Sequence, residues 1–155
     1  MQNKTIMQYF EWYLPNNGLL WKKCKAQASD LKESGIDVVW LPPAYKGAAG
    51  NKSVGYDVYD TYDLGEFMQK GSVATKYGTK DEYLQAIEAF HNAGIEVLAD
   101  VVFNHRMGAD ETEQITVTET AYHDRHYVIS GEKTIQAWTK FTFPGRGDKY
   151  SALKL

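Results

Sequence analysis

Polar side chains follow directly on an apolar segment near the middle of the chain. The segment that begins at Ile95 ends as Asp100-Val101-Val102-Phe103-Asn104-His105. In an extended strand, alternation would place Asp100 and Asn104 on one face and His105 on the other. Because a carboxylate, an amide and an imidazole are costly to bury without partners, these residues indicate a binding or catalytic site. The alternative is a hydrogen-bonded turn, in which His105 caps a backbone carbonyl.

The dipeptide Tyr-Asp occurs three times between residues 54 and 67, each copy starting three residues after the last. This spacing either stacks the pairs on one side of a 3₁₀ turn or spreads them around an extended loop. Aromatic rings beside acidic hydrogen-bond acceptors are suited to binding a sugar. In the alternative, the loop is tied together by its own Tyr–Asp hydrogen bonds, and most of these residues are structural. Both interpretations apply to Tyr56-Asp57, Tyr59-Asp60 and Tyr62-Asp63.

Other polar and aromatic segments are weaker candidates. Phe10-Glu11-Trp12-Tyr13 follows an expected first strand at residues 6–10 and would present its aromatic rings on the same rim. His123 and His126 have a spacing that could serve a metal, although a polar loop is the favoured interpretation. Residues 110–113 are expected to be a solvated acidic stretch. The chain contains no nucleophile motif, no phosphate-binding glycine-rich loop and no zinc-type Cys/His spacing.

A repeated pattern of helix, glycine and strand supplies the elements that would position these residues. Residues 34–40 (SGIDVVW) return in outline at residues 93–99 (AGIEVLA). Gly35 and Gly94 stand where a left-handed residue commonly closes a helix. Thr79 and Glu82 resemble a capping box at the start of the second helix. Apolar residues at helical spacing precede each glycine, namely Trp21, Cys24, Ala28 and Leu31, and then Tyr83, Ile87 and Phe90.

The order of elements predicts an α/β fold with a parallel sheet. Strands covered on both faces would alternate with helices, as in βαβ units. Residues 42–78 and 104–155 then form long excursions after the second and third strands, and the latter carries the alternating stretches 115–117 and 138–143 of a β-rich insertion. A (β/α)₈ barrel needs roughly 200 residues or more. We therefore favour an incomplete barrel over a small open fold of the flavodoxin type, and expect an isolated chain to be partly disordered or oligomeric.

Composition excludes some classes of function. The net charge of −3 provides no basic stripe for nucleic acid, and no run is long enough to span a membrane. Cys24 is the only cysteine, which excludes an internal disulfide and fits a reducing compartment. Residues 1–10 show no signal peptide, so a cytoplasmic protein is expected, with a secreted parent stripped of its signal as the alternative. The 11 tyrosines and 4 tryptophans serve either the core or a surface that stacks on sugars.

Motifs spread over the whole chain resemble the α-amylase family, glycoside hydrolase family 13. Within that family, the chain is similar to the liquefying bacterial and cytoplasmic α-amylases. The residues 100–105 match the first of the family's signature regions. The other matching motifs are Met7-Gln8-Tyr9-Phe10-Glu11-Trp12-Tyr13, Val39-Trp40-Leu41-Pro42-Pro43-Ala44-Tyr45-Lys46-Gly47, Gly55-Tyr56-Asp57 through Tyr62-Asp63-Leu64-Gly65-Glu66-Phe67, Lys76-Tyr77-Gly78-Thr79-Lys80 and Phe143-Pro144-Gly145-Arg146-Gly147.

The resemblance implies a particular domain organisation and activity. Residues 1–103 would be the first three strands of a (β/α)₈ TIM barrel, and residues 104–155 would begin an inserted β-rich domain B. The parent enzyme would cleave α-1,4-glucosidic bonds inside starch, glycogen and maltooligosaccharides with a retaining mechanism. The family's catalytic carboxylates follow later strands, so the 155-residue chain alone is expected to be inactive. The alternatives are another family 13 enzyme, such as a transglycosylase or an α-glucosidase, or a non-catalytic carbohydrate-binding fragment.

The resemblance also implies roles for individual residues. Asn104 would give its side-chain oxygen to a structural calcium between the barrel and domain B, with the other ligands supplied from beyond Leu155. His105 and Tyr56 would line the sugar subsite on the non-reducing side of the cleaved bond. Asp100 would be the buried carboxylate that supports the site by pairing with an arginine on a later strand. Further rim contacts would come from Trp12 and Tyr13.

Overall fold

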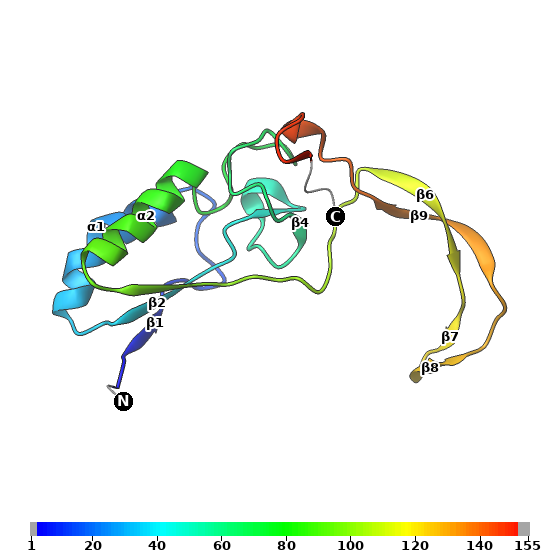
Figure 1. Cartoon of the computed structure of the whole chain (residues 1–155), viewed down its shortest axis with the longest axis horizontal. Coiled ribbons are helices and arrows are strands. Elements are labelled where there is room, and N and C mark those ends of the chain that lie inside the picture. Colours follow the sequence, from blue (N-terminus) through cyan, green and yellow to red (C-terminus); the bar gives the residue numbers. More distant parts are fainter. Residues whose placement is uncertain (1–2, 152–155) are drawn as a thin grey trace. The chain divides into compact units, whose positions relative to one another are not determined.

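The computed structural model describes residues 3–151 (Figure 1). These residues form two compact units. The first comprises the residues up to Met107 together with those from Phe143 onward, and the second is Gly108–Thr142. Among the described residues, neither helix is long and apolar enough to cross a membrane.

A three-stranded parallel sheet is the centre of the first unit. Its strands are β1 (Ile6–Gln8), β2 (Val38–Leu41) and β5 (Glu96–Ala99), in the spatial order β1-β2-β5. Helix α1 (Leu20–Glu33) connects β1 to β2, and helix α2 (Lys80–Asn92) precedes β5. The predicted order of strand, helix, strand, helix and strand is therefore confirmed, as is the parallel pairing.

The start of α2 and the ends of both helices lie where the sequence predicts. The hydroxyl of Thr79 accepts from the backbone N–H of Glu82, and the Glu82 carboxylate accepts from the Thr79 N–H at 2.9 Å, which completes a capping box. Gly35 and Gly94 follow the helices with φ angles of +85° and +73°, in the left-handed region that glycine adopts without strain. The helices pack on each other and on the sheet through apolar side chains that include Trp21, Cys24, Ala28, Tyr83 and Phe90.

The two helices cover one face of the sheet. Val39 and Leu41 point toward the helices and are fully buried. On the opposite face, Ile6 and Leu98 are 59% and 48% exposed, although both are aliphatic. Val38 of β2 is buried on this same face, so the expectation of strands covered on both faces holds in part for β2 and fails for β1 and β5 within the described residues.

The excursion after β2 contains short elements of its own. Strands β3 (Lys46–Gly47) and β4 (Val58–Asp60) form an antiparallel pair, and a 3₁₀ turn, η1 (Gly50–Lys52), lies between them. The third strand of the parallel sheet is shorter than predicted. β5 ends at Ala99, so Asp100–His105 lie outside the sheet and the predicted alternation of faces does not apply to them.

The second unit is an antiparallel ribbon. β6 (Glu111–Val117) pairs with β9 (Lys133–Lys140), and β7 (Thr120–Ala121) pairs with β8 (Asp124–Val128). The predicted β-rich character is confirmed, but the last strand ends at Lys140 rather than at residue 143. Phe143 and the 3₁₀ turn η2 (Pro144–Arg146) pack with the first unit, so the two compact units do not coincide with a division at residue 103.

Candidate functional site

Three of the predicted residues meet where β2 and β5 end. The backbone N–H of Asp100 donates to Leu41 O at 3.1 Å, which extends the sheet by one last bond. Beyond that bond, the Asp100 carboxylate accepts a hydrogen bond from the Tyr56 hydroxyl at 2.7 Å. His105 Nε2 lies 2.8 Å from the carbonyl oxygen of Tyr56. The structure therefore brings Asp100, Tyr56 and His105 into one hydrogen-bonded cluster, the rim cluster.

The hydrogen bonds fix the state of the His105 ring. A carbonyl oxygen only accepts, so Nε2 of His105 must carry the proton that binds Tyr56 O. In the neutral ring, Nδ1 is then an acceptor, and it lies 3.4 Å from the Asn104 Nδ2 amide. His105 caps a backbone carbonyl, as the structural alternative predicted, and it also lies in the cluster that the functional interpretation predicted. The structural interpretation is therefore confirmed for His105, and its role in binding a ligand stays a prediction.

An aromatic ring extends the rim cluster toward solvent. The rings of Trp12 and Tyr56 are parallel to within 4°, with centroids 6.0 Å apart. Trp12 is exposed, so one face of this pair is accessible to a flat ligand. Tyr13 is 87% exposed, and its backbone N–H donates to the Glu11 carboxylate at 2.5 Å. The structure thus brings Trp12 to the cluster but leaves the Tyr13 ring in solvent.

The charge of the Asp100 carboxylate acts on three phenols, of which Tyr45 and Tyr77 are buried and Tyr56 is half-buried. Burial raises the pKa of Tyr56 to about 12, and the hydrogen bond to Asp100 and the charge of that carboxylate act in the same direction. Burial is also the main cause of the raised pKa values of Tyr45 and Tyr77, and the Asp100 charge contributes to both. These hydroxyls therefore remain protonated at neutral pH and act as hydrogen-bonding groups rather than as bases. A role was predicted for Tyr56 but not for Tyr45 or Tyr77.

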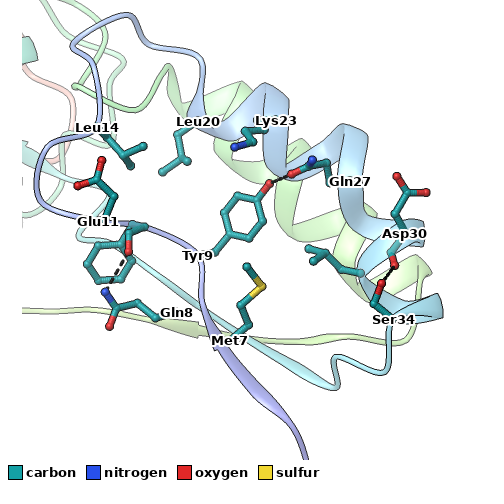
Figure 2. Close-up of a pocket in the computed structure, with 12 residues that line it drawn as sticks. Met7, Gln8, Tyr9, Glu11, Leu14, Leu20, Lys23, Gln27, Asp30 and Ser34 are labelled. Carbon is teal, nitrogen blue, oxygen red and sulfur yellow. Dashed lines mark hydrogen bonds between the residues drawn. The ribbon is translucent and has the colours of Figure 1, made fainter.

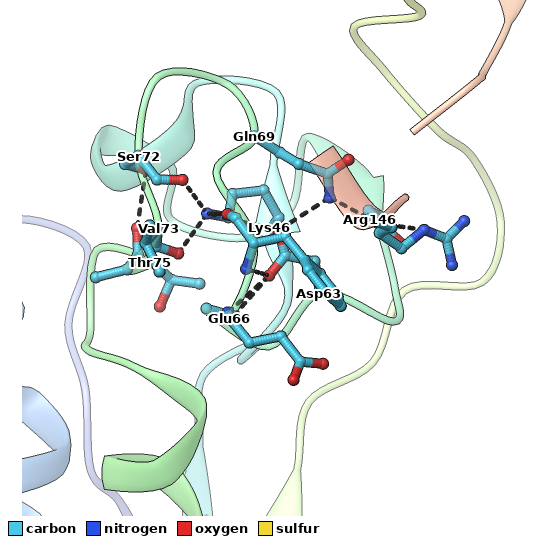
Figure 3. Close-up of polar contacts among 12 residues, drawn as sticks. Lys46, Asp63, Glu66, Gln69, Ser72, Val73, Thr75 and Arg146 are labelled. Carbon is cyan, nitrogen blue, oxygen red and sulfur yellow. Dashed lines mark hydrogen bonds and ion pairs between the residues drawn. The ribbon is translucent and has the colours of Figure 1, made fainter. Parts of the chain in front are cut away.

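A fully buried lysine binds several groups of the loop that runs from Tyr56 to helix α2. Lys46 Nζ donates to the carbonyl oxygens of Ser72 and Val73 at 2.6 Å each (Figure 3). The Asp63 carboxylate lies 3.6 Å from the same ammonium group, and both side chains are inaccessible to solvent. Burial lowers the pKa of Lys46, and the charge of Asp63 opposes this effect. The Lys46 ammonium group thus supplies the positive charge that pairs with Asp63 and the donors that bind two carbonyl groups of the loop.

The aspartates of the Tyr-Asp repeat are structural. Asp63 Oδ1 accepts from three backbone N–H groups, those of residues 65, 66 and 67. Asp60 forms a buried ion pair with Arg146 at 3.1 Å, and Gln69 Nε2 donates to both aspartates (Figure 3). Asp57 accepts from the backbone N–H of residue 49 at 2.9 Å. The predicted structural role is confirmed, but these aspartates bind backbone, lysine, arginine and glutamine groups, whereas Tyr56 donates to Asp100.

Two pockets are relevant to the choice of site. A pocket of about 440 Å³ lies between β1 and α1, and its lining is largely apolar. Tyr9 reaches across it to Gln27 on α1 (Figure 2). This pocket contains none of the rim cluster residues. A smaller pocket of about 300 Å³ is lined by Asp100 together with Tyr45, Tyr62 and Phe103, so one residue of the rim cluster borders it.

The comparisons with known proteins agree with the motifs. A family model for the catalytic domain of α-amylases matches residues 26–146, most of the chain. The chain belongs to the α-amylase family. It is 60% identical to an α-amylase from Geobacillus stearothermophilus over 98% of this chain and 28% of that protein. It is 50% identical to the cytoplasmic α-amylase of Escherichia coli (strain K12) over 97% of this chain and 30% of that protein.

The chain spans about 30% of the length of these α-amylase relatives. Among solved structures, an alternansucrase in complex with isomaltononaose superposes with a TM-score of 0.61 and 23% identity, covering 92% of this chain and 11% of the other. At that level of identity the likeness shows the fold alone. Membership of the α-amylase family makes the three-stranded parallel sheet consistent with part of a (β/α)₈ barrel.

Asn104 was predicted to bind calcium. Its side chain is exposed, and its Nδ2 group faces His105, which leaves the amide oxygen as the potential ligand. An amide oxygen suits the ligand preference of calcium, which takes 6–8 oxygens. Residues 3–151 contain no group of three or more His, Cys, Asp or Glu side chains that could hold a metal. A calcium site at Asn104 therefore remains a prediction, and it would need further ligands.

Proposed function

We propose that this chain is the N-terminal part of an enzyme that hydrolyses α-1,4-glucosidic bonds inside starch, glycogen and maltooligosaccharides. The observation that carries the proposal is the rim cluster, in which Tyr56 binds Asp100 while its ring lies parallel to the exposed Trp12 ring. Parallel aromatic rings beside hydrogen-bonding groups are suited to a pyranose, which has apolar faces and a hydroxylated edge. The names of the α-amylase relatives support the same substrate class.

Each residue of the rim cluster has a distinct role in this proposal. Tyr56 and Trp12 would stack against the sugar on the non-reducing side of the cleaved bond, and Tyr13 would contact it further out. His105 Nδ1 would accept from a sugar hydroxyl in place of its long 3.4 Å contact with Asn104 Nδ2, because Nε2–H is committed to Tyr56 O. Asp100 would hold the Tyr56 hydroxyl and, through its other oxygen, an arginine on a later strand.

The groups that cleave the bond are proposed to come from outside this chain. A retaining glycosidase uses two carboxyl groups about 5–5.5 Å apart, one as nucleophile and one as acid and base. Asp60 and Asp63 are engaged in buried ion pairs, and Asp100 is bound to Tyr56. We therefore infer that both catalytic carboxylates lie in later parts of the enzyme and that this chain binds and orients the substrate.

Calcium and a cytoplasmic location complete the proposal. Asn104 would supply one oxygen ligand to a calcium that stabilises the base of the β-rich insertion, which would be the start of domain B. The close similarity to a relative named cytoplasmic α-amylase supports a cytoplasmic location. The buried free thiol of Cys24 is compatible with a reducing compartment.

The decisive experiment uses the full-length protein that contains this chain. Incubated with maltoheptaose, it should release shorter maltooligosaccharides with the α-configuration at the new reducing end, measured by chromatography and proton NMR. The 155-residue chain assayed in parallel should release none. Products with the β-configuration, or no products, would contradict the proposal.

The same assay tests the alternative of glucan transfer. A 4-α-glucanotransferase from Thermotoga neapolitana is 33% identical over 73% of this chain and 23% of that protein. A transferase would convert maltoheptaose into both longer and shorter chains with no net gain of reducing ends. We expect a net gain, because the relatives named α-amylase are more similar, at 50–60% identity.

A further inference from the structure

We propose that Tyr45 and Tyr77 are positioning residues that each hold one of the two segments that meet in the rim cluster. This inference rests on the proposed function and adds two residues to its machinery. Neither tyrosine would touch the sugar. Each would act through a hydrogen bond to the backbone near a residue that does.

Tyr45 holds the segment that carries Asp100 and His105. Its side chain is buried, and its hydroxyl accepts a hydrogen bond from the Val102 N–H at 2.7 Å. Val102 lies two residues after Asp100 and three before His105. The sheet ends at the Asp100 N–H, and the Met107 N–H binds Val58 O at 2.7 Å. Tyr45 therefore fixes the backbone between these two bonds, where the segment has left the sheet.

Tyr77 holds the segment that carries Tyr56. Its hydroxyl donates to the carbonyl oxygen of Val54 at 3.1 Å, two residues before Tyr56. The ring is almost fully buried and packs against Trp21 on α1, with ring centroids 5.5 Å apart. Tyr77 thus connects the helical core to the segment that presents Tyr56.

The two bonds together determine the geometry of the rim cluster. The Tyr56–Asp100 bond and the His105–Tyr56 bond each join the segment near residue 55 to the segment near residue 102. Two segments can keep distances of 2.7 and 2.8 Å only if both are fixed. Because burial raises the pKa of both Tyr45 and Tyr77, neither phenol ionises near neutral pH, and their effect is geometric.

Removal of single hydroxyls in the full-length enzyme tests the proposal. Tyr45→Phe and Tyr77→Phe should each lower kcat/KM for maltoheptaose on the order of 10-fold, less than the ~100-fold that a 1 Å misplacement can cost. Tyr9→Phe is the matched control, because it also removes a tyrosine hydroxyl that is hydrogen-bonded, here to Gln27 on α1. The control should change the melting temperature by a similar amount and leave kcat/KM within about two-fold.

A double variant separates positioning from a general loss of structure. If Tyr45 acts through His105, Tyr45→Phe should have little further effect in the His105→Ala background, because residues in one network are not additive. Equal fold losses in both backgrounds, or wild-type kcat/KM in the single variants, would overturn the inference.

Hydrogen exchange provides a readout that does not depend on the substrate. Peptides covering residues 101–106 should exchange faster in Tyr45→Phe than in the wild type and should be unchanged in Tyr9→Phe. A wild-type enzyme that fails to hydrolyse α-glucans would refute the proposed function. Unchanged exchange in Tyr45→Phe would instead refute the role of Tyr45.

Discussion

Two excursions leave strand ends in this chain, residues 42–79 after β2 and the ribbon of residues 108–142 after β5. In the first, Lys46, Asp60 and Asp63 are fully buried and paired with groups of the described chain. In the second, Tyr122 and Trp138 are 94% and 69% exposed. The first excursion contains a buried polar core that Arg146 joins from outside it, whereas the ribbon is held by its backbone ladder and surface pairs.

The difference in burial between the two excursions bears on the binding residues, because the buried excursion carries Tyr56. Tyr56 lies in the excursion with the polar core, and that core fixes the loop on which the residue stands. A binding residue must be held within a fraction of an ångström of its productive position. We therefore expect substitutions in the first excursion to have larger effects than substitutions in the ribbon, and the following predictions test that order.

The largest effect is expected from Lys46→Met. The substitution leaves the Asp63 carboxylate buried without its cation and leaves the carbonyl groups of Ser72 and Val73 without their donor. Breaking a buried pair in this way costs about 3–5 kcal/mol. Urea unfolding of the full-length protein measures the loss. Lys22→Met is the control, because Lys22 pairs with Glu82 at the surface, and its loss should cost at most about 1 kcal/mol. Similar losses for both variants would contradict the importance of the buried lysine.

A smaller effect is expected where the first excursion passes into α2. Thr79→Ala removes the side-chain cap that accepts from the Glu82 N–H. Loss of such a cap costs about 0.5–2 kcal/mol of stability. Thr79→Ser keeps the hydroxyl and should keep most of the stability in the same thermal unfolding experiment. If serine and alanine destabilise equally, the cap is not the source of the effect.

Local signals explain which part of the fold was predictable. The capping box at Thr79 and the left-handed glycines Gly35 and Gly94 are signals within a few residues of sequence, so the start of α2 and the ends of both helices were predicted correctly. The third strand was predicted to reach His105, but its partner β2 ends at Leu41 and is followed by Pro42 and Pro43. Proline has no N–H to donate, so the ladder could not continue.

The polar core was not predictable from local sequence. Arg146 is separated from Asp60 by most of the second half of the chain, and Lys46 reaches carbonyl groups of residues 72 and 73. No spacing rule relates such positions. The one available signal was a lysine between apolar residues in Ala44-Tyr45-Lys46-Gly47, which suggests a buried charge. Asp100, Tyr56 and His105 were predicted from residue type and resemblance, and their mutual contacts came from the fold.

A pH-dependent effect is expected at Glu66, where the first excursion meets the segment that follows the ribbon. Burial raises the pKa of its carboxyl, but hydrogen bonds from Lys149, Lys80 and Tyr150 outweigh burial and lower it below the ordinary value of 4.5. A lowered folded pKa stabilises the fold above pH 4.5, and this contribution is lost as pH falls further.

Glu66→Gln should therefore be less stable than the wild type at neutral pH. Its stability should decrease less steeply than that of the wild type as the pH falls below 4.5. Glu33→Gln, at the exposed end of α1, should follow the wild-type curve. The measurement is the urea midpoint of the full-length protein from pH 7 to pH 3. Parallel curves for Glu66→Gln and the wild type would show that the ion pairs do not contribute.

The smallest effect is expected in the ribbon. Lys140 pairs with Glu111 at 2.5 Å, but the two side chains are about half exposed, and solvent screens such a pair. Lys140→Ala should therefore leave the urea midpoint unchanged within error, and added salt should not alter the comparison with the wild type. A loss as large as that of Lys46→Met would mean that the ribbon depends on its charges as the first excursion does. The contrast between the two excursions would then be one of exposure only, since a surface pair would be as important as a buried one.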